Sequence, residues 1–223
     1  MARILLGVTG SVAATKTTLL YQMLLESGHN IRVLATDRSL HFFNPKHLNH
    51  ADNPVIYKEI FFTDEDEWNG RGPNNKYQRG DIVLHIDLSR WAEVLLVAPL
   101  DANSLSKFAM GLTEGCLCSV WRAWDWTKPV ILAPAMNTIM WDHPVTRRHI
   151  YTISEDSGLF SNISSFHNNA QDLIDEINSK GKHFVILPPI TKKLACGDEG
   201  MGAMAEITAI IEQVNKLSLS KGL

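Results

Sequence analysis

The sequence has few cysteines, no long apolar run and no excess of basic residues. Its 3 cysteines show no C-x-x-C spacing, which argues against a disulfide framework or a structural zinc site. No apolar stretch reaches the roughly 20 residues that span a bilayer, and the apolar segment 4–8 is too short for a secretory signal. The formal net charge is −3, without a Lys/Arg run typical of nucleic-acid binding. We therefore expect a cytoplasmic protein with no metal, nucleic acid or membrane as partner.

The chain does contain short apolar runs, several of which are followed by helical patterns. Runs without alternation are typical of strands covered by helices on both faces. A strand, a helix and a strand in close succession predict a right-handed parallel βαβ unit. We expect an α/β Rossmann-like (flavodoxin-like) three-layer sandwich with a mostly parallel sheet, in one domain over residues 1–223. The expected strands are 3–8, 31–35, 94–98, 130–133 and 184–187, and the expected helices are 14–25, 104–110, 170–179 and 204–217.

Three segments are predicted to lie outside this regular pattern. Segment 63–80 joins an acidic cluster to Asn, Gly and Pro, and segment 154–169 is rich in Ser and Asn, so both are expected to be surface loops. Segment 188–202 is rich in glycine after a proline pair, which is typical of a mobile loop that covers a ligand. Cys116 and Cys118 lie in an apolar stretch and are expected to be buried.

The turn after the first expected strand favours an anion. Gly10, Ser11 and Val12 stand where a strand gives way to a helix, and the N–H groups of a helix start attract negative charge. The dinucleotide fingerprint G-x-G-x-x-G is absent, and Thr15 stands where a P-loop requires glycine. A single phosphate, such as that of flavin mononucleotide, fits better. An ordinary strand-to-helix turn is the structural alternative.

Two further strand ends carry polar residues. Thr36, Asp37 and Arg38 follow the second expected strand and could complete a phosphate or ribityl site. Alternatively, Ser39 caps a short helix there. Residues 101–104 supply Asp, Asn and Ser, which either cap the next helix or meet the polar edge of a ring.

Three residues are candidates for the chemistry itself. His85 has aliphatic neighbours, and a neutral imidazole there can act as a base, although a satisfied core histidine is the alternative. Asn137, in the segment Pro-Ala-Met-Asn, suits a carboxylate or amide of a small molecule, or else belongs to a Met-lined core turn. Cys196 lies in the glycine-rich loop near lysines, where a thiol can transfer a proton, unless it is an incidental surface cysteine.

The segment Pro-Ala-Met-Asn…Met-Trp and the segment Ala-Cys-Gly-Asp-Glu-Gly occur together in this chain. In this respect it resembles the homo-oligomeric flavin-containing cysteine decarboxylases, the family of the phosphopantothenoylcysteine decarboxylases. The resemblance runs from residue 4 to about residue 216. It implies a homotrimer with FMN between neighbouring subunits. It also implies conversion of 4′-phosphopantothenoyl-L-cysteine to 4′-phosphopantetheine and carbon dioxide, in coenzyme A biosynthesis.

The resemblance also assigns roles to individual residues. It implies that His85 is the catalytic base, that Cys196 is a proton donor and that Asn137 binds the cysteinyl carboxylate. The FMN contacts that it implies are Gly10, Ser11, Val12, Thr36, Asp37, Arg38, Asp101, Ala102, Asn103, Ser104 and Ala135. The further substrate contacts are Met140, Lys193, Leu194 and Ala195.

The chemistry of such a substrate explains why a flavin is needed. A cysteinyl carboxylate has no electron sink, whereas oxidation of the thiol to a thioaldehyde provides a C=S group that accepts the electrons left by carbon dioxide. Other interpretations are a non-enzymatic phosphatase-regulatory flavoprotein, a decarboxylase of peptide C-terminal cysteine, and a flavin prenyltransferase. The absence of a long acidic tail and the presence of all three candidate residues favour the enzyme.

Overall fold

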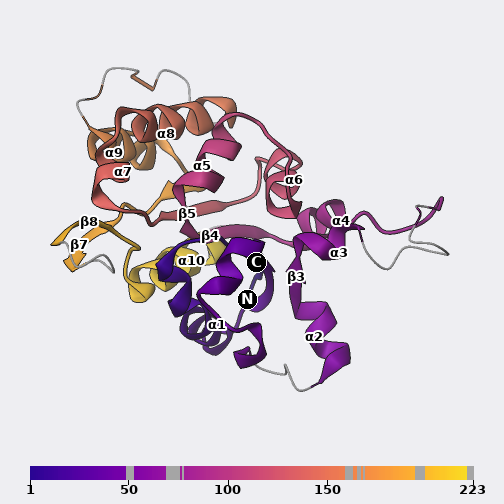
Figure 1. Ribbon diagram of the computed structural model, residues 1–223. Coiled ribbons are helices and arrows are strands. Elements are labelled where there is room, and N and C mark those ends of the chain that lie inside the picture. Colours follow the sequence, from indigo (N-terminus) through magenta and orange to yellow (C-terminus); the bar gives the residue numbers. More distant parts are fainter. Residues whose placement is uncertain are drawn as a thin grey trace.

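The computed structural model is a three-layer α/β sandwich built on a parallel sheet (Figure 1). It describes residues 1–48, 53–68, 76, 78–158, 163–164, 167, 169–193 and 199–219. The strand order is β3-β2-β1-β4-β5-β6, with every neighbouring pair parallel, which is a Rossmann-type order and confirms the predicted fold class. The strands are β1 (Arg3–Val8), β2 (Asn30–Ala35), β3 (Phe61–Thr63), β4 (Val94–Leu100), β5 (Val130–Pro134) and β6 (Phe184–Ile186).

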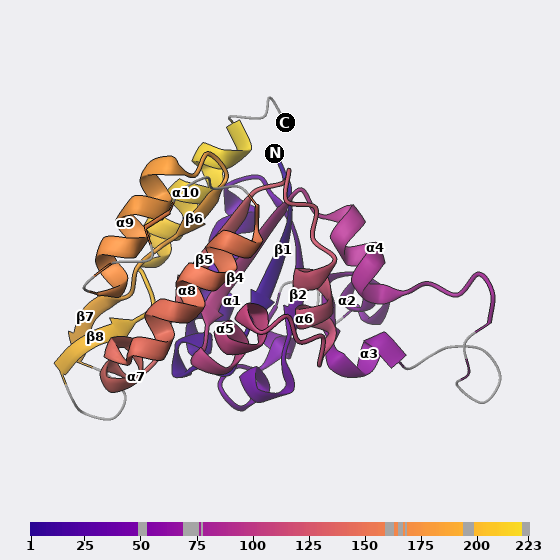
Figure 2. The same ribbon diagram turned by 90° about the horizontal axis from the view of Figure 1, so that it is seen from above.

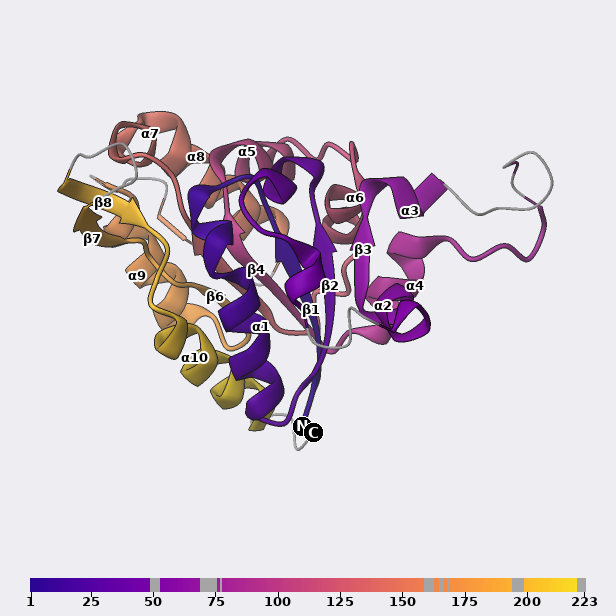
Figure 3. The same cartoon turned by 60° about the horizontal axis from the view of Figure 1, so that its bottom comes forward.

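Helices cover both faces of this sheet. One face carries α1 (Thr17–Glu26), α2 (Pro54–Ile60) and α10 (Ile207–Leu219). The other carries α4 (Leu84–Trp91), α5 (Ala102–Ala109), α6 (Cys116–Arg122), α8 (Pro144–Asp156) and α9 (Ala170–Lys180). Figure 2 shows α5, α6 and α8 over the sheet, and Figure 3 shows α1 and α10 side by side on the opposite face. No helix in the described part of the chain is long and apolar enough to cross a membrane.

The strands contribute to two hydrophobic cores at once. Ile4 and Leu6 of β1 pack with α1 and α10, whereas Leu5 between them packs with the helices of the other face. All residues of β4 are buried. Burial on both faces is the reason why these strands show no alternation of apolar and polar residues. Cys116 and Cys118 are buried as predicted.

Short elements complete the described chain. Two short helices, α3 (Asp64–Trp68) and α7 (Thr138–Asp142), follow β3 and β5. Three 3-10 turns follow β1 and β2, namely η1 (Val12–Lys16), η2 (Asp37–His41) and η3 (Pro45–His47). The helix predicted from residue 14 therefore starts as a 3-10 turn and becomes α-helical at Thr17.

Three predictions about loops need correction. Segment 63–80 was expected to be a polar loop, yet it begins with α3, whose Glu67 is only 3% exposed. Segment 154–169 begins as the last turn of α8. Segment 188–202 contains most of two strands, β7 (Ile190–Lys193) and β8 (Glu199–Ala203), which pair antiparallel and are called the β7–β8 hairpin below. The hairpin lies beside α7 (Figure 2).

Candidate functional site

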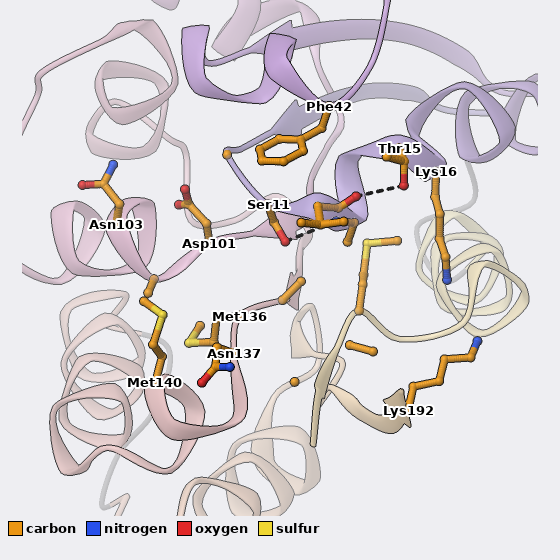
Figure 4. A pocket seen from close by; sticks show the side chains of 18 residues that line it. Ser11, Thr15, Lys16, Phe42, Asp101, Asn103, Met136, Asn137, Met140 and Lys192 are labelled. Carbon is orange, nitrogen blue, oxygen red and sulfur yellow. Dashed lines mark hydrogen bonds between the residues drawn. The ribbon is translucent and has the colours of Figure 1, made fainter. Parts of the chain in front are cut away.

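A cavity of about 680 Å³ opens where β1, β4 and β5 end (Figure 4). Small-molecule sites commonly occupy roughly 300–1,000 Å³. In a sheet of this order, ligands bind beyond the carboxyl ends of the strands where the strand order reverses, here between β1 and β4. The strand-end residues that line the cavity are Gly10, Ser11, Val12, Ala13, Asp101, Ala102, Asn103, Ala135, Met136 and Asn137.

The turn after β1 offers hydrogen-bond donors to this cavity. The Ser11 hydroxyl oxygen accepts a hydrogen bond from the Ala13 N–H at 3.3 Å and so caps η1. The first N–H groups of a helical turn have no acceptor inside the turn, and they carry its positive end. A phosphate is therefore the kind of group that this turn can hold.

The segments that follow β1, β2 and β4 lie in close contact at this turn. The buried Thr9 hydroxyl donates to the Pro99 carbonyl at 2.9 Å and accepts from the Asp101 N–H at 2.7 Å. A Cβ atom on Gly10 would lie 2.7 Å from the Cβ of Arg38 and 3.2 Å from Asp101 Oδ2. Only glycine allows the three strand ends to approach this closely.

Asp101 starts the helix that follows β4. Its Oδ1 accepts from the Ser104 N–H at 2.7 Å, so the capping role considered from sequence is confirmed, with the helix beginning at Ala102. Asn103 lines both this cavity and a second one next to it. Contact of residues 101–104 with a flavin ring stays a prediction.

The second cavity, of about 630 Å³, extends the first toward the end of β2. The two share Gly10, Phe42, Asp101 and Asn103. Thr36, Asp37, Arg38 and Ser104 line the second, together with Asp64, Lys107 and Cys118.

Among the residues after β2, Thr36 has a side-chain hydroxyl that could bind a ligand. The Thr36 hydroxyl is buried and has no hydrogen-bond partner among the described residues. Ser39 does not cap the short helix, because it lies inside η2 and its hydroxyl donates to the Thr36 carbonyl at 2.6 Å. A buried hydroxyl without a partner is costly, so a ligand oxygen at this position would stabilise it.

Four ionisable groups of the second cavity, Asp64, Lys107, Glu114 and Cys118, have shifted pKa values. Burial raises the pKa of the Asp64 carboxyl, and the Cys116 N–H that donates to it offsets part of this. Burial also raises the pKa of the Cys118 thiol to about 11. The hydrogen bond between Lys107 and Glu114 raises the pKa of the Lys107 ammonium and lowers that of the Glu114 carboxyl.

Asn137 stands at the end of β5 and begins α7. Its side-chain Oδ1 accepts from the Ile139 N–H at 2.9 Å and caps the helix. Met140, one turn further, is 48% exposed and lines the same cavity, as does Ala135. The Pro-Ala-Met-Asn segment thus delivers an amide to the cavity, as the sequence pattern indicated.

The β7–β8 hairpin crosses the Pro-Ala-Met-Asn segment. The Met136 N–H donates to the Gly202 carbonyl at 3.0 Å. A Cβ atom on Gly202, whose φ is +153°, would lie 2.1 Å from the Met136 carbonyl oxygen. Lys192 of the hairpin lines the cavity and pairs with Glu206 at 2.6 Å, which lowers the pKa of that carboxyl.

His85 lies elsewhere. It is the second residue of α4, and its Nδ1 is 2.8 Å from Oε1 of Glu67 on α3. It lines neither of the two cavities described above. Helices α4 and α7 lie at opposite ends of the molecule in all three overall views (Figures 1–3). Within one chain, the structure therefore does not bring His85 and Asn137 together.

The candidate residues of the glycine-rich loop, Lys193 to Cys196, are described only in part. Leu194, Ala195 and Cys196 lie outside the described residues, and Lys193 is the last residue of β7. Their predicted roles stay predictions. No cluster of metal-ligating side chains occurs within the described ranges.

Several residues that line the first cavity were not singled out from sequence. They are Ala13, Thr15, Lys16, Phe42, Met136, Lys192, Gly202, Ala203 and Met204. Thr15 and Lys16 lie one turn beyond Ser11, so the spacing of the first helical turn could have indicated them. Phe42 follows η2, and no motif pointed to it.

A parallel sheet in this order, with polar strand ends around a cavity at its carboxyl edge, defines an α/β protein of the nucleotide- or flavin-binding class. The chain belongs to the Flavoprotein family, whose model matches residues 1–219.

Known relatives agree with this assignment over nearly the full length. The chain is 40% identical to a phosphopantothenoylcysteine decarboxylase of Mus musculus, over 99% of this chain and 89% of that protein. It is 41% identical to one of Arabidopsis thaliana, over 95% of this chain and 83% of that protein.

Solved structures also resemble the chain. One is a mutant of PPC decarboxylase in complex with pantothenoylaminoethenethiol, with a TM-score of 0.73, 38% identity and 96% of each chain covered. Another is the FMN binding protein AtHal3, with a TM-score of 0.72 and 38% identity, over 98% of this chain and 97% of that one.

Proposed function

We propose that this chain is an FMN-dependent decarboxylase that converts 4′-phosphopantothenoyl-L-cysteine to 4′-phosphopantetheine and carbon dioxide, a step of coenzyme A biosynthesis. The observation that carries the proposal is that one cavity collects residues 10–12, residues 101–103, Ala135 and Asn137, which the family resemblance assigns to cofactor and substrate. Relatives of about 40% identity bear the name of this activity.

The residues around the two cavities fit FMN. The turn at Gly10, Ser11 and Val12, together with Arg38, supplies donors for a single phosphate, and the unpaired Thr36 hydroxyl supplies one for a phosphate or ribityl oxygen. We assign Asp37 to the same end of the cofactor. Asp101, Ala102, Asn103, Ser104 and Ala135 are assigned to the flavin ring. When bound, FMN would take up a hydride from the carbon that bears the thiol and later return it.

The opposite wall of the cavity suits the substrate. The Asn137 side chain provides an amide for the cysteinyl carboxylate, and Met140 gives apolar contact beside it. We assign the backbone of Lys193, Leu194 and Ala195 to a clamp over the substrate. Cys196 would donate the proton that the enethiolate needs after carbon dioxide has left.

We infer that the base comes from a second copy of the chain. We propose a homotrimer with FMN at the subunit interface, in which α4 of one copy brings His85 to the cavity of its neighbour. Support comes from the positions of α4, which carries His85, and α7, which Asn137 caps, because the two helices lie on different sides of the chain (Figures 1–3). A cytoplasmic location stays a prediction.

Purified protein loaded with FMN tests the function directly. Incubation with substrate labelled with ¹³C in the cysteinyl carboxylate should release labelled carbon dioxide, and phosphopantetheine should form in equal amount. The serine analogue is the matched control and should release none, because it lacks the thiol. A protein that binds FMN and leaves the labelled substrate intact would contradict the proposal.

A further inference from the structure

Glu67 is a buried carboxylate that holds His85 at two points. Its side chain is 3% exposed. Oε2 accepts a hydrogen bond from the backbone N–H of His85 at 2.9 Å, and Oε1 lies 2.8 Å from the ring Nδ1. The Cys116 thiol also donates to Oε2, at 3.4 Å. Burial of a carboxylate is costly unless donors surround it, and here they do.

These contacts fix the start of α4. Val83, in the N-cap position, makes no side-chain cap hydrogen bond, so Glu67 from α3 satisfies the N–H of the second helical residue instead. Because that N–H can only donate, Oε2 must accept from it. The carboxylate is thereby held in one orientation, with Oε1 toward the imidazole.

This orientation determines which ring nitrogen carries the hydrogen. An ionised carboxylate can only accept hydrogen bonds, so Nδ1 must be the donor. In the neutral ring, Nε2 then keeps its lone pair. The His85 side chain is 24% exposed, so the ring is not sealed in the core.

We propose that Glu67 is a positioning residue that keeps His85 in the Nδ1–H tautomer, so that Nε2 is the proton-accepting atom of the decarboxylase. The inference rests on the proposed function, in which His85 is the base. It gives a role in the reaction to Glu67, which lies in the acidic segment that precedes His85. This role requires at position 67 an acceptor-only side chain that faces both the backbone and the ring.

The substitution Glu67→Gln tests the proposal. A glutamine has one acceptor oxygen and one NH₂ group, and the backbone N–H and the thiol need the oxygen. The NH₂ group must then donate to Nδ1, and the ring shifts its hydrogen to Nε2. We expect ¹⁵N NMR of the imidazole to report Nδ1–H in the wild type and Nε2–H in the variant. We also expect kcat to fall by about 100-fold or more, with KM and FMN content unchanged.

Two further variants separate positioning from folding. Glu67→Asp keeps an acceptor-only group and should retain the Nδ1–H tautomer and part of the lost kcat. Glu65→Gln, on the exposed side of the same helix, should change neither readout. An Nε2–H ring in the wild type would overturn the proposal, even if the glutamine variant does not fold. So would a glutamine variant whose tautomer changes while its kcat does not.

The NMR readout also distinguishes this inference from the proposed function. If the wild-type protein releases no carbon dioxide, the function fails, whereas the ring tautomer still reports whether Glu67 controls His85.

Discussion

The Asn137 side chain caps α7 with its Oδ1 atom, and it is also proposed to bind the carboxylate of the substrate. Asp is as good an N-cap as Asn. We therefore expect Asn137→Asp to change the free energy of unfolding by less than about 0.5 kcal/mol. KM should rise by at least about tenfold, because a carboxylate would face the carboxylate of the substrate. Thermal unfolding and steady-state kinetics measure the two effects.

A second capping asparagine provides the control for this variant. Asn169 caps α9, where its Oδ1 accepts from the Asp172 N–H at 2.9 Å. Asn169→Asp should leave both stability and KM unchanged. An Asn137→Asp variant with wild-type KM would show that the amide does not contact the substrate carboxylate.

At the scale of residues, the polar side chains that follow the strands were the part of the site that the sequence predicted. Ser11, Asp101 and Asn137 each follow an apolar strand in the sequence, and parallel strands bring their carboxyl ends to one edge. Phe42 and Glu67 could not be predicted in this way. Phe42 lines the cavity because it lies at the end of the 3-10 turn η2, and no sequence motif indicated this residue. Glu67 is buried where it accepts a hydrogen bond from the backbone N–H of His85 at the start of α4.

At the scale of elements, the β7–β8 hairpin depends on a glycine. Gly202→Ala would place a methyl group against the Met136 carbonyl at a φ of +153°, where an L side chain is strained by about 1–3 kcal/mol. We expect the hairpin to separate from the Pro-Ala-Met-Asn segment. Hydrogen exchange at the Met136 N–H should become faster, and KM should rise.

The control for the hairpin variant is Gly28→Ala. Gly28 also has a positive φ, of +84°, but nothing lies within 4 Å of an added Cβ atom. This change should lower stability without affecting KM. Unchanged exchange at Met136 in the Gly202→Ala variant would show that the hairpin does not depend on this contact.

The elements differed in how well the sequence predicted them. Strands β1, β2, β4, β5 and β6 were found because burial on both faces makes them continuous apolar runs. The hairpin was missed because its strands are rich in Lys and Gly, which have low strand propensity. Strand β3 has only three residues, too few for a pattern.

At the scale of the whole molecule, the position of α4 predicts that two inactive variants restore each other. His85→Asn lacks the base and Asn137→Asp has a raised KM, so both are expected to be nearly inactive alone when the substrate concentration is kept well below the wild-type KM. Co-expressed copies with different affinity tags can be purified as mixed oligomers. In a cyclic trimer, one of the interfaces then combines an intact His85 with an intact Asn137, so activity should return to about one third of wild type.

Mixed oligomers without activity would contradict a site shared between copies. Separately purified variants, mixed without exchange of subunits, are the control and should stay inactive. That residues 1–223 form one domain stays a prediction, and a single cooperative unfolding transition would support it.

The unpaired Thr36 hydroxyl has a consequence for the life of the polypeptide in a cell. A ligand that binds the native form and satisfies this group shifts the folding equilibrium toward that form. Chains synthesised when riboflavin is scarce should therefore unfold more often and reach proteases sooner. The abundance of the enzyme would then follow the vitamin supply without any change in gene expression.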